Sequence, residues 1–553
     1  MRSAVAMARG EELRPIADVA AEAGLHPEEV EPYGRFRAKV GLSVLDRLAD
    51  RPDAPVVVVT AVTPTPPGEG KTTTSIGLTQ GLAAAGKRPV LCLREPSMGP
   101  TFGQKGCGTG GGRAQVVPMV DINLHFTGDL HAVAAAHNLL AAAIDASLFH
   151  RNPLDIDPAT IGWPRCVDVN DRTLRQIVTG LGGYGVPREA GFLITAASEV
   201  MAVLALASDL SDLRARLGRI VIAESRDGRP VTADDLRAAG AMAVLLMDAL
   251  LPNLVQTTEG QPALVHTGPF GNIAHGNSSA IAARIARKLG DVVITEAGFG
   301  ADLGLEKYCH IVAPHGLEPA VAVLVASVRA LKWHGGIPDD ALHIEDTDAV
   351  KRGAENLAAH IDIVKTFGLR CVVAVNRFSA DTDRELKLAT ALAMELGADA
   401  AAIHEGFGRG GQGAEDLARA VAEAVTPPGG FRPLNPSGTS VPEQIDTIAT
   451  RLYGAGGIEI SPRARRSLDR LGARGADRLP VCMAKSHLSL SPDPGLRGRP
   501  QGFRLPVRDL IPAAGAGFVV ALTGDILRMP GLGSEPAFTR IDLDDQGRPV
   551  GLV

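Results

Sequence analysis

Cysteine and aromatic residues are scarce in this chain of 553 residues. The six cysteines lie far apart, at positions 92, 107, 166, 309, 371 and 482. No two of them form a Cys-x-x-Cys pair, and none joins a histidine at the spacing of a zinc site. This distribution argues against a disulfide framework or a zinc module and predicts a reduced, cytoplasmic protein.

Long hydrophobic runs and concentrated basic patches are also missing. The N-terminal MRSAVAMARGEEL has no apolar core of secretory length, and no segment approaches the ~20 apolar residues of a membrane span. The formal net charge is -6, and the most basic stretch, 461–478, mixes Asp with Arg as a solvated helix does. We therefore expect no nucleic-acid partner and no membrane association.

Short apolar runs alternate with amphipathic helical patterns over much of the chain. The run APVVVVTAV at 54–62 is typical of a parallel strand buried on both faces. Similar runs lie at 87–95, 291–300, 320–331 and 370–378, and the helical patterns at 351–368 and 383–397 close on Gly. This alternation predicts an α/β fold with a P-loop NTPase-like, doubly wound and mostly parallel sheet.

Two changes of pattern divide the chain. Residues 151–289 have mostly helical patterns, for example at 198–218 and 232–251, and we expect them to form an inserted, mainly helical domain. The Pro-, Gly- and Ser-rich stretch at 424–440 marks the start of a smaller C-terminal α/β domain at 426–553. Residues 1–150 and 290–425 would then form the nucleotide-binding core.

The sequence TPTPPGEGKTTT follows the first buried strand and opens a helix. A phosphate-binding loop needs backbone N–H groups turned inward, a lysine for the β/γ charge and a hydroxyl for Mg²⁺. Thr65 stands where the first glycine of that motif is usual, and a structural glycine turn is the alternative. The predicted ATP-binding residues are Thr65, Pro66, Pro67, Gly68, Glu69, Gly70, Lys71 and Thr72, together with Asn376 at a later strand end.

Charged residues follow other predicted strands at their carboxyl ends, where such sheets bind ligands. Arg94 and Glu95 follow 87–95; the arginine would stabilise a transferring phosphoryl group, or else form a surface salt bridge with Glu95. Glu296 ends 291–300 and, with Thr72, is a candidate Mg²⁺ ligand, or else a structural carboxylate. The glycine-rich 106–112 is a covering loop or a flexible connection. For His125, His131, His266 and His275, a hydrogen-bonded, partly buried structural role is the simpler expectation.

A series of motifs, in order along the chain, resembles one family. The sequence contains TPTPPGEGKTTT, REPSMGPTFG, HFTGDLHAV, NLVQTTEG, HTGPFGNIAHG, TEAGFGADLG, NRF, PAAGAGFVVALTGDI and MPGLG. Together these strongly resemble formate–tetrahydrofolate ligases, also called formyltetrahydrofolate synthetases, from near residue 35 to the last few residues. The resemblance implies that formate attacks the γ-phosphate of MgATP to give formyl phosphate, and that tetrahydrofolate then takes the formyl group.

The same resemblance implies roles for particular residues. Lys71 and Arg94 match positions that hold the intermediate, and Glu95 is a further catalytic candidate that would also contact folate. Phe378 and Phe407 match the positions that sandwich the pterin, although many members have Trp where this chain has Phe407. The family's reaction implies that formate, tetrahydrofolate and ATP are the binding partners of this chain. Members of the family are typically homotetramers activated by K⁺ or NH₄⁺.

Two other functions remain open from the residues alone. One is an ATP-dependent switch or assembly protein. The partitioning and metal-cluster ATPases carry an extra lysine five positions before the loop lysine, and Pro66 occupies that position here, which disfavours this class. The other is a different carboxylate-activating ligase with the same core, resembling dethiobiotin synthetase. Dependence of ADP release on formate and tetrahydrofolate separates all three.

Overall fold

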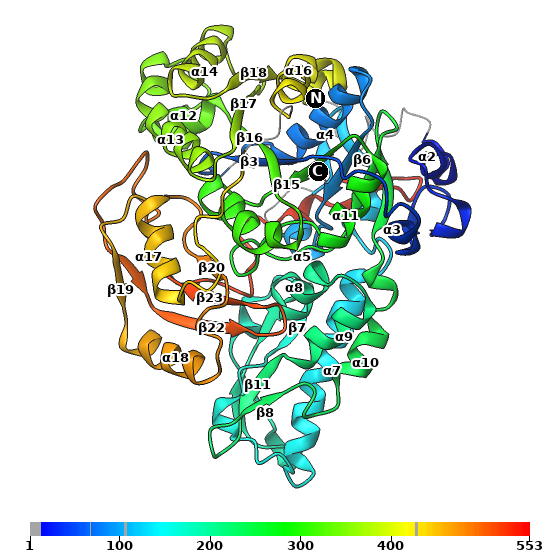
Figure 1. Ribbon diagram of the computed structural model, residues 1–553, viewed down its shortest axis with the longest axis vertical. Coiled ribbons are helices and arrows are strands. Elements are labelled where there is room, and N and C mark those ends of the chain that lie inside the picture. The colour runs from blue at the N-terminus through cyan, green and yellow to red at the C-terminus, as the bar shows by residue number, and fades with distance from the viewer. Residues whose placement is uncertain (1–12, 67, 104–107, 426–429, 553) are drawn as a thin grey trace.

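A large, mostly parallel sheet lies at the centre of the molecule (Figure 1). The computed structural model describes residues 13–66, 68–103, 108–425 and 430–552. The strand order is β1-β2-β13-β14-β4-β15-β3-β16-β17-β18, with β6 also paired to β13 and β5 to β6. The strands are β1 (Val30–Pro32), β2 (Ala38–Val40), β3 (Val56–Ala61), β4 (Pro89–Leu93), β5 (Gly110–Gly111), β6 (Ala114–Val117), β13 (Asn253–Thr257), β14 (Pro262–Val265), β15 (Val292–Glu296), β16 (Pro319–Ala326), β17 (Arg370–Asn376) and β18 (Ala400–His404).

All five predicted strands are present, as β3, β4, β15, β16 and β17, and every pairing from β14 to β18 is parallel. The chain passes from β3 to β4 on one side of β3, whereas β16, β17 and β18 lie on the other side. The turn after β3 therefore lies where the strand order reverses, which is where open α/β sheets bind ligands.

Helices cover both faces of this sheet, because alternate strand residues point to opposite sides. Val57 and Val59 pack in one cluster with α4 (Lys71–Ala84) and α16 (Glu415–Ala424). Val56 and Val58 pack in the other cluster with α11 (Ala280–Leu289), α13 (Thr347–Thr366) and α14 (Asp383–Glu395). The mixed α/β class with a large, mostly parallel sheet is thus confirmed.

The segment 151–289 is mixed rather than mainly helical, which corrects that expectation. The pattern at 198–218 is two helices, because Ala207 is extended and the Asp209 side chain caps the second one. Strands β13 and β14 join the central sheet. The other elements are β7 (Arg165–Val167), β8 (Ile177–Thr179), β9 (Arg188–Ala190), β10 (Phe192–Ile194), α8 (Glu199–Leu206), α9 (Leu210–Gly218), β11 (Val221–Glu224), β12 (Pro230–Thr232) and α10 (Ala239–Leu245).

The residues after 430 build a smaller α/β unit beside the central sheet (Figure 1). Its three-stranded sheet has the order β20-β23-β22, and β19 pairs with β21. The elements are α17 (Val441–Arg451), β19 (Ile458–Ile460), α18 (Pro462–Ala473), β20 (Val481–Ala484), β21 (Leu505–Val507), β22 (Asp509–Ala513), β23 (Phe518–Leu522), β24 (Asp542–Leu543) and β25 (Pro549–Val550). The predicted domain boundaries themselves stay predictions.

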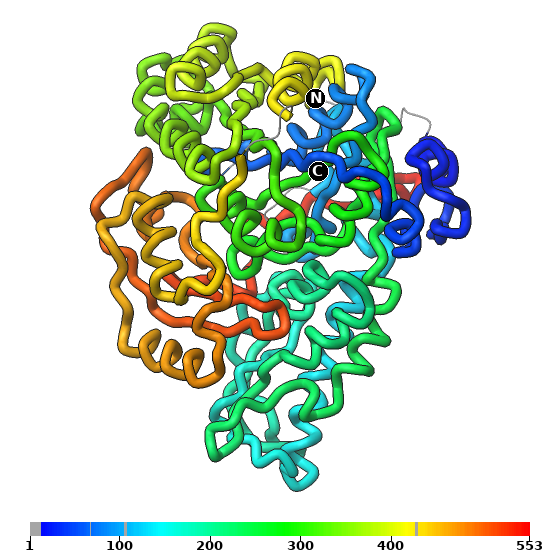
Figure 2. Tube along the Cα trace, viewed as in Figure 1, coloured from blue at the N-terminus to red at the C-terminus, as the bar shows by residue number. Residues whose placement is uncertain are grey.

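The last residues return to the core of the molecule. In Figure 2 the red trace runs from the C-terminal unit behind the central sheet. The amide of Ala537 donates to the carbonyl of Gly103 at 2.6 Å, and Leu552 packs on Met119. The shorter helices are α2 (Ile16–Glu22), α3 (Ser43–Arg47), α5 (Met98–Phe102), α6 (Met119–Asn123), α12 (Val328–His334) and α15 (Gly406–Arg409).

One helix, α7 (Asp129–Phe149), is long and apolar enough to cross a membrane by length and composition. The expectation that no segment approaches the length of a membrane span overlooked this helix. Its buried residues, among them Val133, His137, Leu140 and Ile144, recur at helical spacing, and the helix contacts α8, α10 and β7. A helix in a protein core can meet the same criteria of length and composition, so these criteria are weak support for a membrane span.

Cysteines 92, 166, 309, 371 and 482 are all buried and free. Burial raises the pKa of the Cys166 and Cys371 thiols to about 12. These thiols therefore act as small apolar core residues.

Candidate functional site

The buried side chain of Glu69 stabilises the turn between β3 and α4 by hydrogen bonds. Its Oε1 accepts hydrogen bonds from Thr65 N at 2.9 Å and Thr65 Oγ1 at 2.6 Å. Ser327 Oγ donates to Glu69 Oε2, and Asn376 Nδ2 donates to the Glu69 carbonyl at 3.0 Å. The buried Glu69 carboxylate thus ties the turn to the end of β16, and the Glu69 backbone carbonyl ties it to the end of β17.

Two glycines give the turn its shape. Gly68 and Gly70 have φ values of 78° and 80°, which disfavour other residues. A Cβ at Gly70 would lie 2.2 Å from Asn376 Nδ2, so the amide packs directly on the backbone. Gly70 is the N-cap of α4 and provides no side-chain cap. The free N–H groups and the dipole of this helix start therefore suit an anion.

Lys71, Arg94 and Glu296 form a charged group beside this turn. Burial lowers the pKa of the Lys71 amine, while the carboxylates of Glu296, Glu69 and Asp302 oppose that shift. Burial also lowers the pKa of Arg94, and Glu296 again opposes it. The Lys71 side chain forms no hydrogen bond or ion pair with any residue the structure describes. Both cations are therefore available to a phosphate.

Buried polar atoms without a partner in the described chain gather at the same sheet edge. Such atoms are rare in folded proteins, and a cluster of them indicates a polar ligand. Some belong to residues at or beyond the ends of β4 and β15, and others to the segment 267–277 that follows β14. They are Arg94 Nε, Glu95 Oε2, Thr267 Oγ1, His275 Nδ1 and Nε2, Asn277 Oδ1, Glu296 Oε1 and Asp302 Oδ1.

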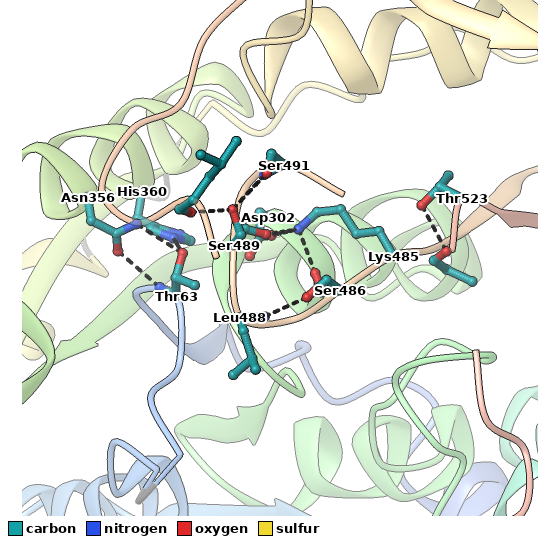
Figure 3. Close-up of polar contacts among 12 residues, drawn as sticks. Thr63, Asp302, Asn356, His360, Lys485, Ser486, Leu488, Ser489, Ser491 and Thr523 are labelled. Carbon is teal, nitrogen blue, oxygen red and sulfur yellow. Dashed lines mark hydrogen bonds and ion pairs between the residues drawn. The ribbon is translucent and has the colours of Figure 1, made fainter. Parts of the chain in front are cut away.

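A second polar network supports the start of the turn (Figure 3). Thr63 Oγ1 lies 2.9 Å from His360 Nε2 and accepts from Asn356 Nδ2 at 3.0 Å. Beside it, Lys485 Nζ of the C-terminal unit lies 2.7 Å from Asp302 Oδ2. A Cβ on Gly300 would meet Asp302, His360 and the Val62 carbonyl within 3.2 Å. The C-terminal unit thus reaches the rear of the β3–α4 turn.

Glu95 belongs to a different group from its neighbour Arg94. Burial raises the pKa of Glu95 well above its ordinary value; Asp129 adds to the shift and Lys39 opposes it. Lys39 itself lies 2.8 Å from Asp129 Oδ1. In the described parts of the chain Arg94 forms no ion pair with Glu95, so the alternative of a surface salt bridge between them is wrong. Both residues lie just beyond the end of β4, and their side chains have different charged neighbours.

The two predicted folate rings lie at the ends of β17 and β18 but have different surroundings. The Arg329 guanidinium lies 3.5 Å from the Phe378 ring centroid, and that ring also approaches Gly70. Phe407 is 42% exposed, and its ring lies against Gly111 and Gly112. One face of Phe378 is therefore already covered, whereas Phe407 can accept a flat ligand.

The four histidines differ from one another. His266 is buried, and its ring nitrogens contact Ser279 Oγ at 2.6 Å and the Ala249 carbonyl at 2.8 Å, as expected. His275 is buried without a partner for either nitrogen, contrary to expectation, and burial lowers its pKa to about 3. His125 and His131 are exposed rather than partly buried, and their nitrogens lie 2.9 Å apart.

Several residues of the site were not predicted. Ser327 and Arg329 follow the end of β16, so the strand-end argument could have found them. Asp302 lies in a π-helix and Lys485 directly follows β20 of the C-terminal unit, and no sequence pattern joins them. Of the predicted residues, Pro66 is exposed, Thr72 lies in the first turn of α4, and Pro67 falls outside the described residues.

Comparison with known proteins gives this geometry its context. Residues 2–553 match the family model described as formate–tetrahydrofolate ligase. The chain belongs to the formate–tetrahydrofolate ligase family. It is 54% identical to the formate–tetrahydrofolate ligase of Roseiflexus sp. (strain RS-1), with all of both chains covered. Identity to the Saccharopolyspora erythraea ligase is 53%, over 99% of this chain and 98% of that one. The Paracoccus denitrificans ligase is 53% identical over all of both chains.

Family membership confirms the resemblance that the ordered motifs indicated, and it identifies the chain as a ligase of this family. The β3–α4 turn corresponds to the first of those motifs, and Glu296 and Asp302 lie in TEAGFGADLG. Among the residues that the structure describes, no three His, Cys, Asp or Glu side chains gather as a preformed metal site.

Proposed function

We propose that this protein ligates formate to tetrahydrofolate at the expense of ATP, giving 10-formyltetrahydrofolate, ADP and phosphate. The observation that carries the proposal is the cluster of unpartnered buried polar atoms beside the helix start at Gly70. A charged, transient intermediate needs such an enclosed polar site, since bulk water would hydrolyse it.

In the first step we assign the β3–α4 turn to the phosphates of MgATP, as a P-loop. Residues 65–70 and the first N–H groups of α4 would cradle them, with Lys71 at the β/γ charge. The Thr72 hydroxyl and Glu296 would hold the Mg²⁺ that arrives with ATP. A formate oxygen attacks the γ-phosphorus, the bond to the β-phosphate oxygen breaks, and ADP leaves. Asn376 would orient the nucleotide through its contact with the turn.

Formyl phosphate is the product of that step, and Arg94 is suited to hold it. Its guanidinium lies at the sheet edge without a carboxylate partner, so it can pair with the acyl phosphate as charge develops. Lys71 neutralises the same group from the turn. Both residues would raise the rate by stabilising charge that is greater in the transition state than in bound formate.

In the second step the amine nitrogen of tetrahydrofolate attacks the formyl carbon. The bond from that carbon to the phosphate oxygen breaks, phosphate leaves with the electron pair, and the nitrogen loses its proton. Phe378 and Phe407 are proposed to bind the pterin, and Glu95 to contact the folate. The exposed ring of Phe407 supports its part most directly.

Other properties come from the family resemblance. We expect a homotetramer in the cytoplasm, activated by a monovalent cation such as K⁺ or NH₄⁺. These expectations are tested by light scattering and by activity in Na⁺ against K⁺ or NH₄⁺.

One assay separates this proposal from its rivals. ADP release should require formate and tetrahydrofolate together, with formation of the folate product followed by absorbance. A switch ATPase would release ADP slowly without either substrate. A related ligase resembling dethiobiotin synthetase would accept another carboxylate and no folate. ADP release that is indifferent to both substrates would exclude the ligase function.

A further inference from the structure

A cavity of about 240 Å³ lies between the segment 137–224 and the C-terminal unit. It is lined by residues of β10, α8, β11, β22 and β23, and by none of the residues assigned to the ligase site. In Figure 1, α8, β11, β22 and β23 lie below the central sheet, away from α4. At about 30 Å³ per water, the space equals roughly eight water molecules, so it suits a small ligand.

The wall of the cavity includes a rigid aromatic pair. The Trp163 ring stacks on His137 with centroids 4.3 Å apart and planes at 21°. Trp163 Nε1 donates to the His137 carbonyl at 3.2 Å. The His137 nitrogens contact Ser198 Oγ and the Pro164 carbonyl, each at 2.8 Å. With these polar atoms satisfied, the indole offers the cavity an apolar flat surface. Leu193, Ile222, Ile511, Phe518 and Val520 line the rest.

Three of the four charged residues in the lining already have partners. Arg474 Nη2 pairs with Glu224 Oε1 at 2.5 Å. Glu199 Oε1 accepts hydrogen bonds from the amides of Gly515 at 2.8 Å and Ala516 at 3.4 Å. These contacts hold both carboxylates in place.

Arg528 is the charged residue of the cavity lining whose side chain has no partner among the described residues. Its guanidinium forms no hydrogen bond or ion pair within the described parts of the chain. Its backbone is nevertheless fixed, since its carbonyl accepts from Ile194 N and the Met529 carbonyl accepts from Arg175 Nε, both at 2.9 Å. The Arg528 charge also contributes to the lowered pKa of His137, about 4, which burial mainly causes. The cation and the aromatic wall are therefore neighbours.

We propose that this cavity is a second ligand site that binds a small organic monocarboxylate with an apolar, preferably aromatic, body. The carboxylate would pair with the fork of Arg528, whose N–H donors match two carboxylate oxygens. The body would lie against Trp163 and the aliphatic wall. A second charge on the ligand would meet apolar side chains or charged groups that already have partners, which is unfavourable. The site is additional to the proposed ligase chemistry and shares no residue with it.

The two tryptophans of the chain provide a direct readout. Trp163 lines the cavity, whereas Trp333 is buried under the Arg497 guanidinium at 4.1 Å. In the full-length Trp333→Phe variant the tryptophan emission reports on Trp163 alone. Titration with 3-phenylpropionate should change that emission saturably, and 3-phenylpropionamide, its neutral analogue, should bind at least tenfold more weakly.

Substitutions of Arg528 test the charge in the same background. Arg528→Met should weaken 3-phenylpropionate binding by about tenfold or more, since hydrogen bonds to charged groups are the stronger class. Arg528→Lys keeps the charge and should retain part of the affinity. This variant distinguishes loss of the charge from a folding defect in Arg528→Met. Arg451→Met, at the exposed end of α17, is the matched control and should bind normally.

Three results would contradict the proposal of a second ligand site. They are an unchanged Trp163 emission at millimolar 3-phenylpropionate, equal affinity for the acid and the amide, and normal binding by Arg528→Met. The folate-dependent ligase assay is run on the same variants. Loss of probe binding with normal ligase turnover supports a separate site, and parallel loss of both would assign Arg528 to the structure of the ligase instead.

Discussion

Lys485 and Asp302 form a buried ion pair that joins the C-terminal unit to the rear of the β3–α4 turn. Their atoms Nζ and Oδ2 lie 2.7 Å apart, and both side chains are almost fully buried. The Lys485 amine also donates to the Ser486 carbonyl at 2.9 Å (Figure 3). Asp302 has no other hydrogen-bond partner among the described residues, so Lys485 is its one direct cationic partner there.

Removing one partner of this pair should destabilise the protein more than removing both. Lys485→Met leaves a buried carboxylate without a cation, which typically costs about 3–5 kcal/mol. We expect the Lys485→Met/Asp302→Asn double variant to melt at a higher temperature than Lys485→Met. The KM for ATP should also rise in Lys485→Met, because unpaired Asp302 would compete for Lys71, and should recover in the double variant. Additive losses in melting temperature and in KM would show that the two residues act independently.

Lys71→Ala should abolish ligation without unfolding the protein. The amine lies at the helix start and has no partner among the described residues, so its removal breaks no structural contact. Steady-state ADP release and the melting temperature are the two measurements. Lys87→Ala, an exposed lysine just beyond the other end of α4, is the matched control and should be fully active. Retained activity with normal ATP affinity in Lys71→Ala would remove the turn from the nucleotide site.

Arg94→Ala should lower turnover by roughly a hundredfold or more, since a charge-assisted donor of this kind is worth on the order of 3 kcal/mol in a transition state. ATP synthesis from ADP and carbamoyl phosphate, an analogue of the intermediate, should fall in parallel. Arg88→Ala, which removes an exposed ion pair just before the same strand, should have no such effect. Survival of the partial reaction together with weaker folate binding would place Arg94 in the other half of the site.

Phe407→Trp should lower the KM for tetrahydrofolate by about 2- to 10-fold, because indole offers more stacking surface than phenyl. Phe149→Trp alters another exposed phenylalanine, at the far end of α7, and should leave that KM unchanged.

Phe378→Ala should raise the folate KM selectively. Its ring also contacts Arg329, which donates to the Gly68 carbonyl, so the ATP titration decides its role. If the KM values for ATP and formate rise as well, Phe378 supports the turn and the pterin stacks elsewhere.

Glu199→Gln should become more stable than the parent protein as the pH rises. Burial raises the pKa of Glu199 to about 7. The ordinary value is lower, so ionisation opposes folding: the penalty is absent below pH ~4.5 and complete above pH ~7. The relative gain should reach up to roughly 3 kcal/mol at pH 8, since each pKa unit is worth about 1.4 kcal/mol. Melting curves at pH 5 and pH 8 measure it, with the exposed Glu355→Gln as control. A difference independent of pH would contradict the assignment.

Much of the fold was predictable because it depends on local patterns. Runs of β-branched residues predicted β3, β4, β15, β16 and β17, since strands buried on both faces must be apolar throughout. Helical spacing and closing glycines predicted α13 and α14. The order of the motifs predicted the family, and the glycines and lysine after β3 predicted the shape of the turn that carries Lys71.

The sequence alone determined which residues end each strand, but only the tertiary structure decided which of those ends meet. Strand order depends on long-range pairing, so neither the joining of β13 to the sheet nor the approach of Lys485 to Asp302 could be read from nearby residues. The strand-end rule grouped Arg94 with Glu95, yet Arg94 lies near Glu296, whereas Glu95 lies near Asp129 and Lys39. Burial and charge balance at a site depend on neighbours distant in sequence, and those neighbours are fixed only when the sheet and the C-terminal unit pack together.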